Sequence, residues 1–175
     1  MLQSSACAAA TASSVRRDDE EIRLANLAAR VAAAGRRFLA TGSLDEHRDL
    51  PVLRSARDLL QAGAATLSHD IVPHSADVFQ RESYALARLT HSALHTGPPE
   101  RGVDTNRKHA TAKELQQLAD DVSVLLDPHA KPADVRSAAD DVSKVFSRIS
   151  STVLREFARS GDSIGGASGS GATTL

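Results

Sequence analysis

The sequence predicts an all-α protein: a four- or five-helix up-and-down bundle with long amphipathic helices and disordered tails. Three observations lead to this prediction. Apolar residues recur at alternating spacings of three and four along most of the chain, which places them on one side of an α-helix. No segment shows sustained alternation of β-branched residues, so no sheet is expected. Proline and glycine residues separate the periodic segments from one another.

The composition indicates one domain with tails. The chain has 175 residues, of which 41% are hydrophobic and 25% charged, enough for both a core and a soluble surface. Only 3% are aromatic, so Ala, Leu and Val must build the core. The net charge of −1 disfavours a broadly basic nucleic-acid-binding protein. A single cysteine, Cys7, allows no internal disulfide, and no apolar run is long enough to span a membrane.

The predicted domain boundaries follow this composition. Residues 1–14 are expected to form a disordered N-terminal tail, residues 15–161 a single helical bundle domain, and residues 162–175 a flexible Gly/Ser-rich tail. The cytoplasm is the expected compartment, because the N-terminus lacks the apolar segment of a secretory signal. Organelle targeting through residues 1–17 is the alternative, although the acidic run at 18–21 is atypical of such presequences.

The first predicted helix spans residues 15–41 and ends at Gly42. Its acidic residues lie near the start and its basic residues near the end, the order that the helix dipole favours. The second helix spans residues 50–68, with Pro51 in the first turn, where proline is tolerated. Gly63 in its interior destabilises the helix unless a neighbouring helix approaches closely there. The apolar side of the first helix carries Leu24, Leu27, Val31, Ala34 and Phe38.

The third helix lies between Pro73 and Gly97, and two descriptions of its start are open. Pro73 can occupy its first turn with Asp70 as the N-cap, or it can be a kink that joins the second and third helices. Either way, one apolar side is expected. It comprises Val72, Phe79, Leu86, Leu89 and Ala93.

Residues 97–110 form the longest predicted loop, a length typical of functional or disordered segments. Thr111-Ala-Lys-Glu114 is a capping box, so the fourth helix is predicted to begin at Thr111. The fifth helix is predicted from Pro132 to Gly161, and the short connection before it indicates antiparallel packing against the fourth. Spacings near 3.5 in the first and fifth helices predict coiled-coil-like packing. The apolar side of the fifth helix carries Val135, Ala138, Val142, Phe146, Ile149, Val153 and Phe157.

His91 and His95 are the candidate metal ligands, because a spacing of four lets two imidazoles bind one ion from one side of a helix. However, they lie about 140° and about 180° from Leu86, the centre of the apolar side, at 100° per residue. Metal sites in helical bundles point inward. Such a site would also need further ligands, for which the sequence offers Glu82, Asp120 and Asp121.

No other catalytic template is present: the sequence has no phosphate-binding loop, no Gly-x-Ser-x-Gly elbow and no His-Glu-x-x-His. Cys7 lies in the predicted tail, away from any feature that would activate its thiol. The loop 97–110 is basic, but acidic residues are mixed into it, so nucleic-acid binding is the least favoured hypothesis. No cofactor is expected.

One strip of the third helix combines residue types that are enriched at protein interfaces, and it is the predicted partner-binding surface. The sequence therefore predicts a non-enzymatic helical bundle that acts through protein–protein contacts, as a subunit, scaffold or adaptor of a larger assembly. It would bind protein partners or self-associate through helix faces. The alternative is a metal- or haem-binding bundle, an oxidase or carrier, that uses His91 and His95. The strip consists of Tyr84, Arg88, His91 and His95.

Overall fold

The computed structural model describes residues 4–68, 77–95 and 105–162. These ranges contain five α-helices and no strand, which confirms the predicted all-α bundle. None of these helices combines the length and the apolar character that crossing a membrane requires. The helices are α1 (Ser4–Thr41), α2 (Leu50–Ser68), α3 (Val78–Leu94), α4 (Thr105–Leu126) and α5 (Pro132–Asp162).

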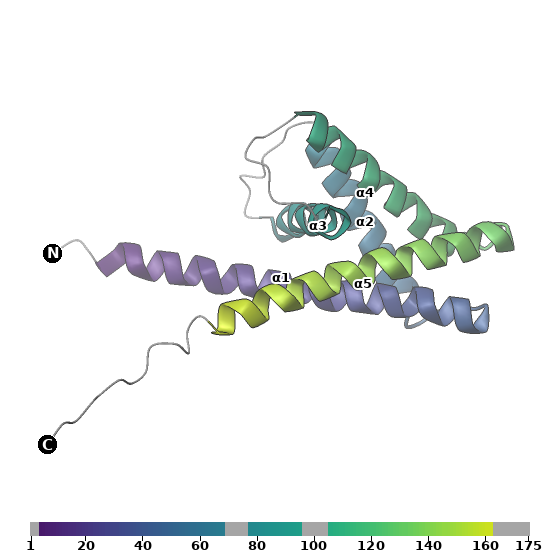
Figure 1. Cartoon of the computed structure of the whole chain (residues 1–175), viewed down its shortest axis with the longest axis horizontal. Helices are drawn as coiled ribbons and strands as arrows, with labels where there is room; N and C mark the ends of the chain where they lie inside the picture. The colour runs from purple at the N-terminus through teal and green to yellow at the C-terminus, as the bar shows by residue number, and fades with distance from the viewer. Residues whose placement is uncertain (1–3, 69–76, 96–104, 163–175) are drawn as a thin grey trace, which may run out of the picture.

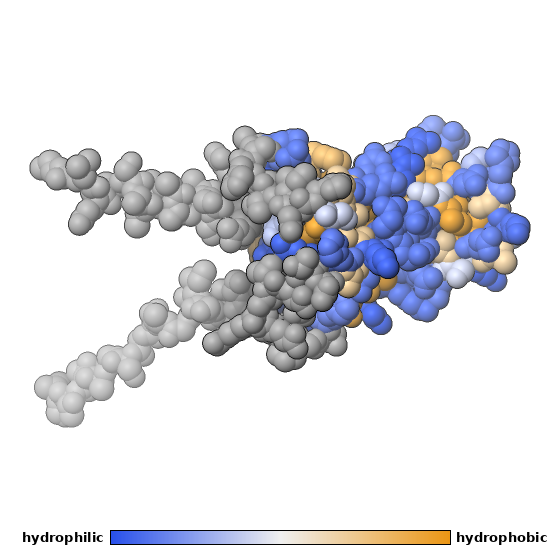
Figure 2. Space-filling view, turned by 90° about the horizontal axis from the view of Figure 1, so that it is seen from above, coloured by the Kyte–Doolittle hydropathy of each residue, from blue (hydrophilic) through white to orange (hydrophobic). Residues whose placement is uncertain are grey.

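The two longest helices, α1 and α5, lie side by side and run in opposite directions (Figure 1). On one side of this pair lie the other three helices, with α2 packed mainly against α4, and α3, seen end-on in Figure 1, packed against α2 and α5. Because α5 contacts α1, α3 and α4, it connects the long pair to the other three helices. Hydrophilic residues cover much of the described part of the face in Figure 2, with hydrophobic residues visible between them.

Small residues allow α1 and α5 to approach closely. A Cβ atom added to Gly35 would lie 2.8 Å from the carbonyl oxygen of Ala139 and 3.0 Å from Cβ of Ser143. Such backbone proximity needs a residue without a side chain at this position, since real Cβ atoms do not come this close. Gly35 therefore marks a close contact between α1 and α5.

The contact of Gly63 shows that α2 and α3 lie side by side. A Cβ atom on Gly63 would lie 2.9 Å from the carbonyl oxygen of Ser83, so α2 and α3 pack against each other. They are therefore two separate helices and not one kinked rod. The N-cap of α3 is Asp77, whose carboxylate accepts a hydrogen bond from the Phe79 amide at 3.0 Å. Asp70, the predicted cap, lies outside the described residues together with Pro73 and Val72.

The helix bounds agree with the sequence for α2 and closely for α5, but α1 and α4 begin earlier than predicted. Residues 4–14, predicted as a tail, belong to α1; this segment is rich in alanine, the residue with the highest helix propensity. Residues 105–110, predicted as a loop, form the first turns of α4, since no proline or glycine follows Gly102 there. Gly42 ends α1 as predicted, with a φ of 73°.

Ala, Leu and Val make up most of the core, and Phe146 of α5 is the largest fully buried side chain. The predicted apolar side of α5 is buried throughout, except that Phe157 is only partly covered. In α3 the prediction is wrong for Phe79, which is 45% exposed. Residues 77–80 are all exposed, so the first turn of α3 receives little cover from its neighbours, although it continues the buried side.

Candidate functional site

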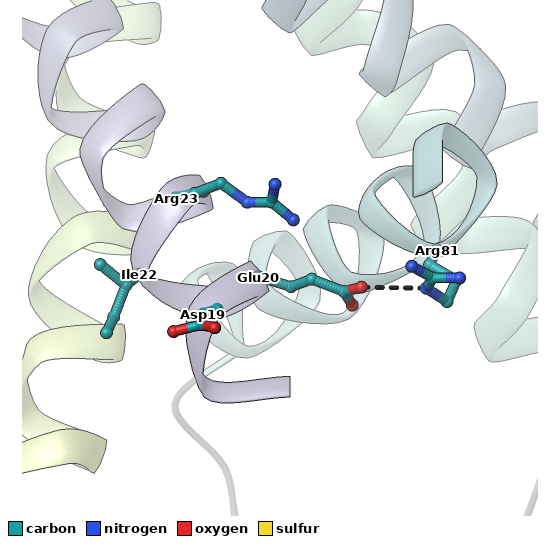
Figure 3. A pocket seen from close by; sticks show the side chains of 5 residues that line it. All are labelled: Asp19, Glu20, Ile22, Arg23 and Arg81. Atoms are coloured by element: carbon teal, nitrogen blue, oxygen red, sulfur yellow. Dashed lines mark hydrogen bonds and ion pairs between the residues drawn. The ribbon is translucent and has the colours of Figure 1, made fainter. Parts of the chain in front are cut away.

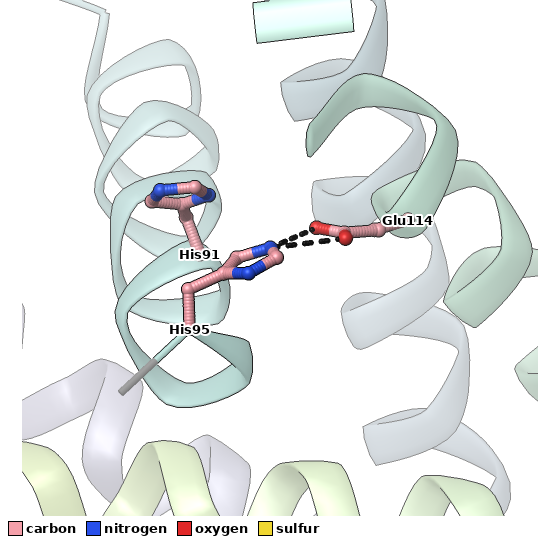
Figure 4. Close-up of side chains that lie close together, drawn as sticks. All are labelled: His91, His95 and Glu114. Carbon is pink, nitrogen blue, oxygen red and sulfur yellow. Dashed lines mark hydrogen bonds and ion pairs between the residues drawn. The ribbon is translucent and has the colours of Figure 1, made fainter. Parts of the chain in front are cut away.

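The structure turns the predicted histidine pair toward α4. His91 and His95 lie one turn apart at the end of α3, where His95 is the C-cap, and their ring centroids are 4.6 Å apart. Nδ1 of His91 lies 2.8 Å from Oγ1 of Thr111. Nε2 of His95 lies 3.0 and 3.1 Å from the two carboxylate oxygens of Glu114 (Figure 4). Side chains from two helices thus converge at this point.

The angles from Leu86 predict that both histidines lie on an uncovered side of α3. In the structure, α4 partly covers that side. His91 is partly buried and the His95 side chain is 43% exposed. The prediction treated the apolar side of α3 as its only covered side. In the structure, α4 begins six residues before Thr111 and contacts α3 near these histidines, so a second side of α3 is partly covered as well.

Glu114 is the functional candidate that the sequence prediction missed. The sequence assigned Thr111 and Glu114 to a capping box, but α4 has already begun at this point. Because these two residues are three apart on one helix, they lie on the same side and can face a histidine pair four apart. This match in spacing was the available signal, although it becomes informative only when the two helices are known to be neighbours.

The acidic residues that the sequence offered as further metal ligands have other contacts. Glu82 forms an ion pair with Arg23 of α1 at 3.1 Å. Asp120 and Asp121 accept hydrogen bonds at 2.9 and 3.1 Å from glutamines one turn earlier in α4. None of the three belongs to the cluster of His91 and His95 with Glu114.

A cavity of about 300 Å³ lies beside Glu114, between the end of α3 and the facing sides of α4 and α5. Burial raises the pKa of Asp121, a hydrogen bond from Gln117 lowers it, and the charges of Asp141 and Asp120 raise it further, so it lies above its ordinary value. Glu114, Asp121 and Asp141 thus bring three carboxyl groups to this cavity. The cavity is lined by Leu94, Glu114, Gln117, Leu118, Asp121, Asp141 and Val145.

Arg88 and Tyr84, the other two residues of the predicted partner-binding strip, have surroundings that differ from those of the histidines. Arg88 forms an ion pair with Glu21 of α1. Tyr84 is 45% exposed. The strip is thus divided: Arg88 contacts α1, the histidines contact α4, and Tyr84 lies on the surface.

Ion pairs join α1 to α3. Besides Glu21 with Arg88, Glu20 pairs with Arg81 at 2.9 Å and Arg23 with Glu82. A second cavity, of about 450 Å³, lies at this seam; Figure 3 shows Glu20 reaching toward Arg81 while Ile22 points away from it. Acidic and basic side chains line it together, so their charges largely compensate. The lining residues are Asp19, Glu20, Ile22, Arg23 and Arg81.

Large apolar side chains are also exposed on the described parts of α1, α3 and α5. Ile22 lies in α1 between Glu20 and Arg23, which pair with the first half of α3, but its own side chain points away from Arg81 (Figure 3). Gly35 faces Ala139 and Ser143 across the antiparallel α1–α5 pair, so the register places Ile22 at about the level of Leu154. We call this group the end surface, although around α3 Val78, Phe79 and Tyr84 are at least about 100° apart at 100° per residue, so the side chains point in different directions. Within the described residues the group contains the large hydrophobic side chains that are most exposed: Ile22, Val78, Phe79, Tyr84 and Leu154.

A scan of protein-family models and searches of curated proteins and of solved structures find no match to this chain. The described residues form an all-α bundle with a histidine–carboxylate cluster at one α3–α4 contact and exposed apolar side chains on three helices.

Proposed function

We propose that this protein is a helical bundle that acts without enzymatic activity, through protein–protein contacts, as a subunit, scaffold or adaptor of a larger assembly. The observation that carries the proposal is the exposure of large apolar side chains on three helices, the group named the end surface. Their exposure ranges from 44% for Val78 to 62% for Leu154.

The composition of the end surface supports a protein partner. Aromatic and large aliphatic residues surrounded by charged ones are typical of interface centres with polar rims. Phe79 and Tyr84 supply the aromatic groups, and the ion pairs of the α1–α3 seam supply fixed charges next to them. A protein that covered these side chains would remove their apolar area from water, which favours association.

Site-specific photo-cross-linking tests the proposal. A benzophenone amino acid replaces Tyr84 in one variant and Gln61, an exposed residue of α2, in the control. We expect a discrete cross-linked product from position 84 in the cells that make the protein, identified by mass spectrometry as a second copy or another protein. Equal labelling from both positions, or none, contradicts the proposal.

Native mass spectrometry of the gently isolated protein provides the second test. We expect a mass equal to a multiple of the chain, or to the chain with stoichiometric protein partners. Phe79→Asp should shift this species to the free chain without changing the far-UV circular dichroism, because Phe79 lies largely outside the core. A wild-type protein that is only monomeric and free of partners contradicts an assembly role.

A further inference from the structure

The cluster of His91, His95 and Glu114 has the composition of a metal site. One ligand atom from each of the three residues lies within 4.8 Å of the other two. Zinc binds nitrogen and oxygen ligands at about 2.0–2.1 Å, so tetrahedral ligands are about 3.3 Å apart. The His95–Glu114 pair, at 3.0 Å, is already near that separation, and only His91 must move closer.

The elements that carry the three residues favour this small movement. His91 and His95 stand one turn apart on α3, and their rings are neighbours, with centroids 4.6 Å apart and planes tilted by 39°. The bond to Thr111 turns Nδ1 of His91 toward α4, the helix that carries Glu114. The His95 and Glu114 side chains are 43% and 32% exposed, so they can adjust and an ion can enter from solvent.

The ligand atoms of the three residues and the charges around them indicate which ions the cluster can bind. Two imidazole nitrogens and one carboxylate oxygen suit divalent ions of the zinc type, whereas magnesium and calcium prefer oxygen ligands alone. The neighbouring cavity adds the carboxylates of Asp121 and Asp141, which also favour a cation. An ion here would replace the direct contact between Nε2 of His95 and the carboxylate of Glu114.

We propose that His91, His95 and Glu114 bind one divalent transition-metal ion of the zinc type, which links the end of α3 to α4. Three protein ligands leave a fourth position for water or for a donor atom from another molecule. This site is independent of the end surface, because the two involve different residues and can be tested separately.

Zinc titration of untagged, metal-stripped protein tests the site. We expect one equivalent of Zn²⁺ by calorimetry and elemental analysis, and a higher melting temperature with the metal, since an ion that binds only the folded state stabilises it. Glu114→Gln and His95→Ala should each weaken binding at least tenfold, and the double variant H91A/H95A should abolish it. Co²⁺ should give visible absorption bands of a four-coordinate site in the wild type but not in H91A/H95A.

His129→Ala is the matched control, because His129 is exposed in the connection between α4 and α5 and belongs to no cluster of metal ligands among the described residues. It should bind zinc like the wild type, and far-UV circular dichroism should show that every variant is folded. The proposal is overturned if the wild type takes up no Zn²⁺ at tens of micromolar. Wild-type affinity in the folded H91A/H95A variant overturns it as well.

Discussion

At the scale of single residues, Asp49 is a buried charge at the corner between α1 and α2. Its side chain is 2% exposed, and it accepts hydrogen bonds from Arg37 at 3.0 and 2.6 Å and from the Asp45 amide at 2.9 Å. Asp49→Asn removes the charge that these donors stabilise and should lower the free energy of unfolding by about 1–3 kcal/mol. Urea unfolding at pH 7 measures this. Asp58→Asn, at an exposed carboxylate, is the control and should leave the midpoint unchanged.

The effect of Asp49 should depend on pH. Burial raises its pKa, but the hydrogen bonds and charges of Arg37 and the Asp45 amide outweigh burial, so its pKa lies below the ordinary 3.8. The unfolded chain therefore binds the proton more readily, and the stabilisation is complete above about pH 4 and disappears as the pH falls through the lower, folded pKa. The difference between wild type and Asp49→Asn should shrink on acidification. A constant difference down to pH 2 would contradict this assignment.

Asp121 should behave in the opposite way. Its pKa is raised, chiefly by burial, so its charged form destabilises the folded state at neutral pH. A carboxyl with a raised pKa lowers stability as the pH rises through the window between its unfolded and folded pKa values. Asp121→Asn should therefore raise the melting temperature at pH 7, and this gain should vanish near pH 3. A lower melting temperature of Asp121→Asn at pH 7 would contradict this prediction, because it would mean that the Asp121 carboxylate is stabilised in the folded state.

The residue scale also shows what the sequence predicts about the candidate site. A spacing of four is enough to identify His91 and His95 as a pair, because helical periodicity is local. Glu114 requires knowledge of which helix lies beside α3, and this depends on packing between segments that are not adjacent in sequence. The angles of His91 and His95 around α3 relative to Leu86 place them away from the apolar side. These angles cannot reveal that α4 covers a second side of α3.

At the scale of elements, Gly35 determines how closely α1 and α5 pack. In an exposed helix, Gly→Ala stabilises by about 1 kcal/mol through helix propensity. Here the new Cβ would meet the Ala139 backbone at 2.8 Å, so Gly35→Ala should destabilise the protein despite the better propensity. Thermal unfolding measures the sign. Ala29→Gly, at an exposed position of α1, is the control for propensity, and a rise in stability for Gly35→Ala would contradict the close contact.

The helix ends differ in how well the sequence predicts them. α2 and α5 begin at prolines in the first turn and are bounded by strong signals, so their predicted bounds agree closely with the structure. The predicted start of α4 at Thr111 is wrong, because a helix can begin without a capping box and α4 already begins at Thr105. Residues 105–110 contain no helix-breaking residue, and Thr111 contacts His91, so its hydroxyl is used between helices.

At the scale of the whole molecule, periodicity predicts which residues of each helix are buried but not which helices meet. Most residues of the predicted apolar sides of α1 and α5 lie in the core because these helices cover each other, whereas Leu27, Phe38 and Phe157 are only partly buried against it. The close packing of α3 against α2 depends on Gly63. In the sequence this glycine is only a local defect, whose contact partner is unspecified.

The role of α5 as the connection between the long pair and the other helices predicts a single unfolding transition. Phe146 is fully buried in α5, and Phe146→Ala should cost about 3–5 kcal/mol, a large part of the ~5–15 kcal/mol that stabilises an ordinary domain. The chain has one tyrosine and no tryptophan, so the fluorescence of Tyr84 reports on α3, whereas far-UV circular dichroism reports on all helices. Both probes should give the same urea midpoint in the wild type, and both should shift together in Phe146→Ala. Leu154→Ala, at a position 62% exposed, should shift neither, and separate midpoints for the two probes would mean that the α1–α5 pair unfolds independently of α3.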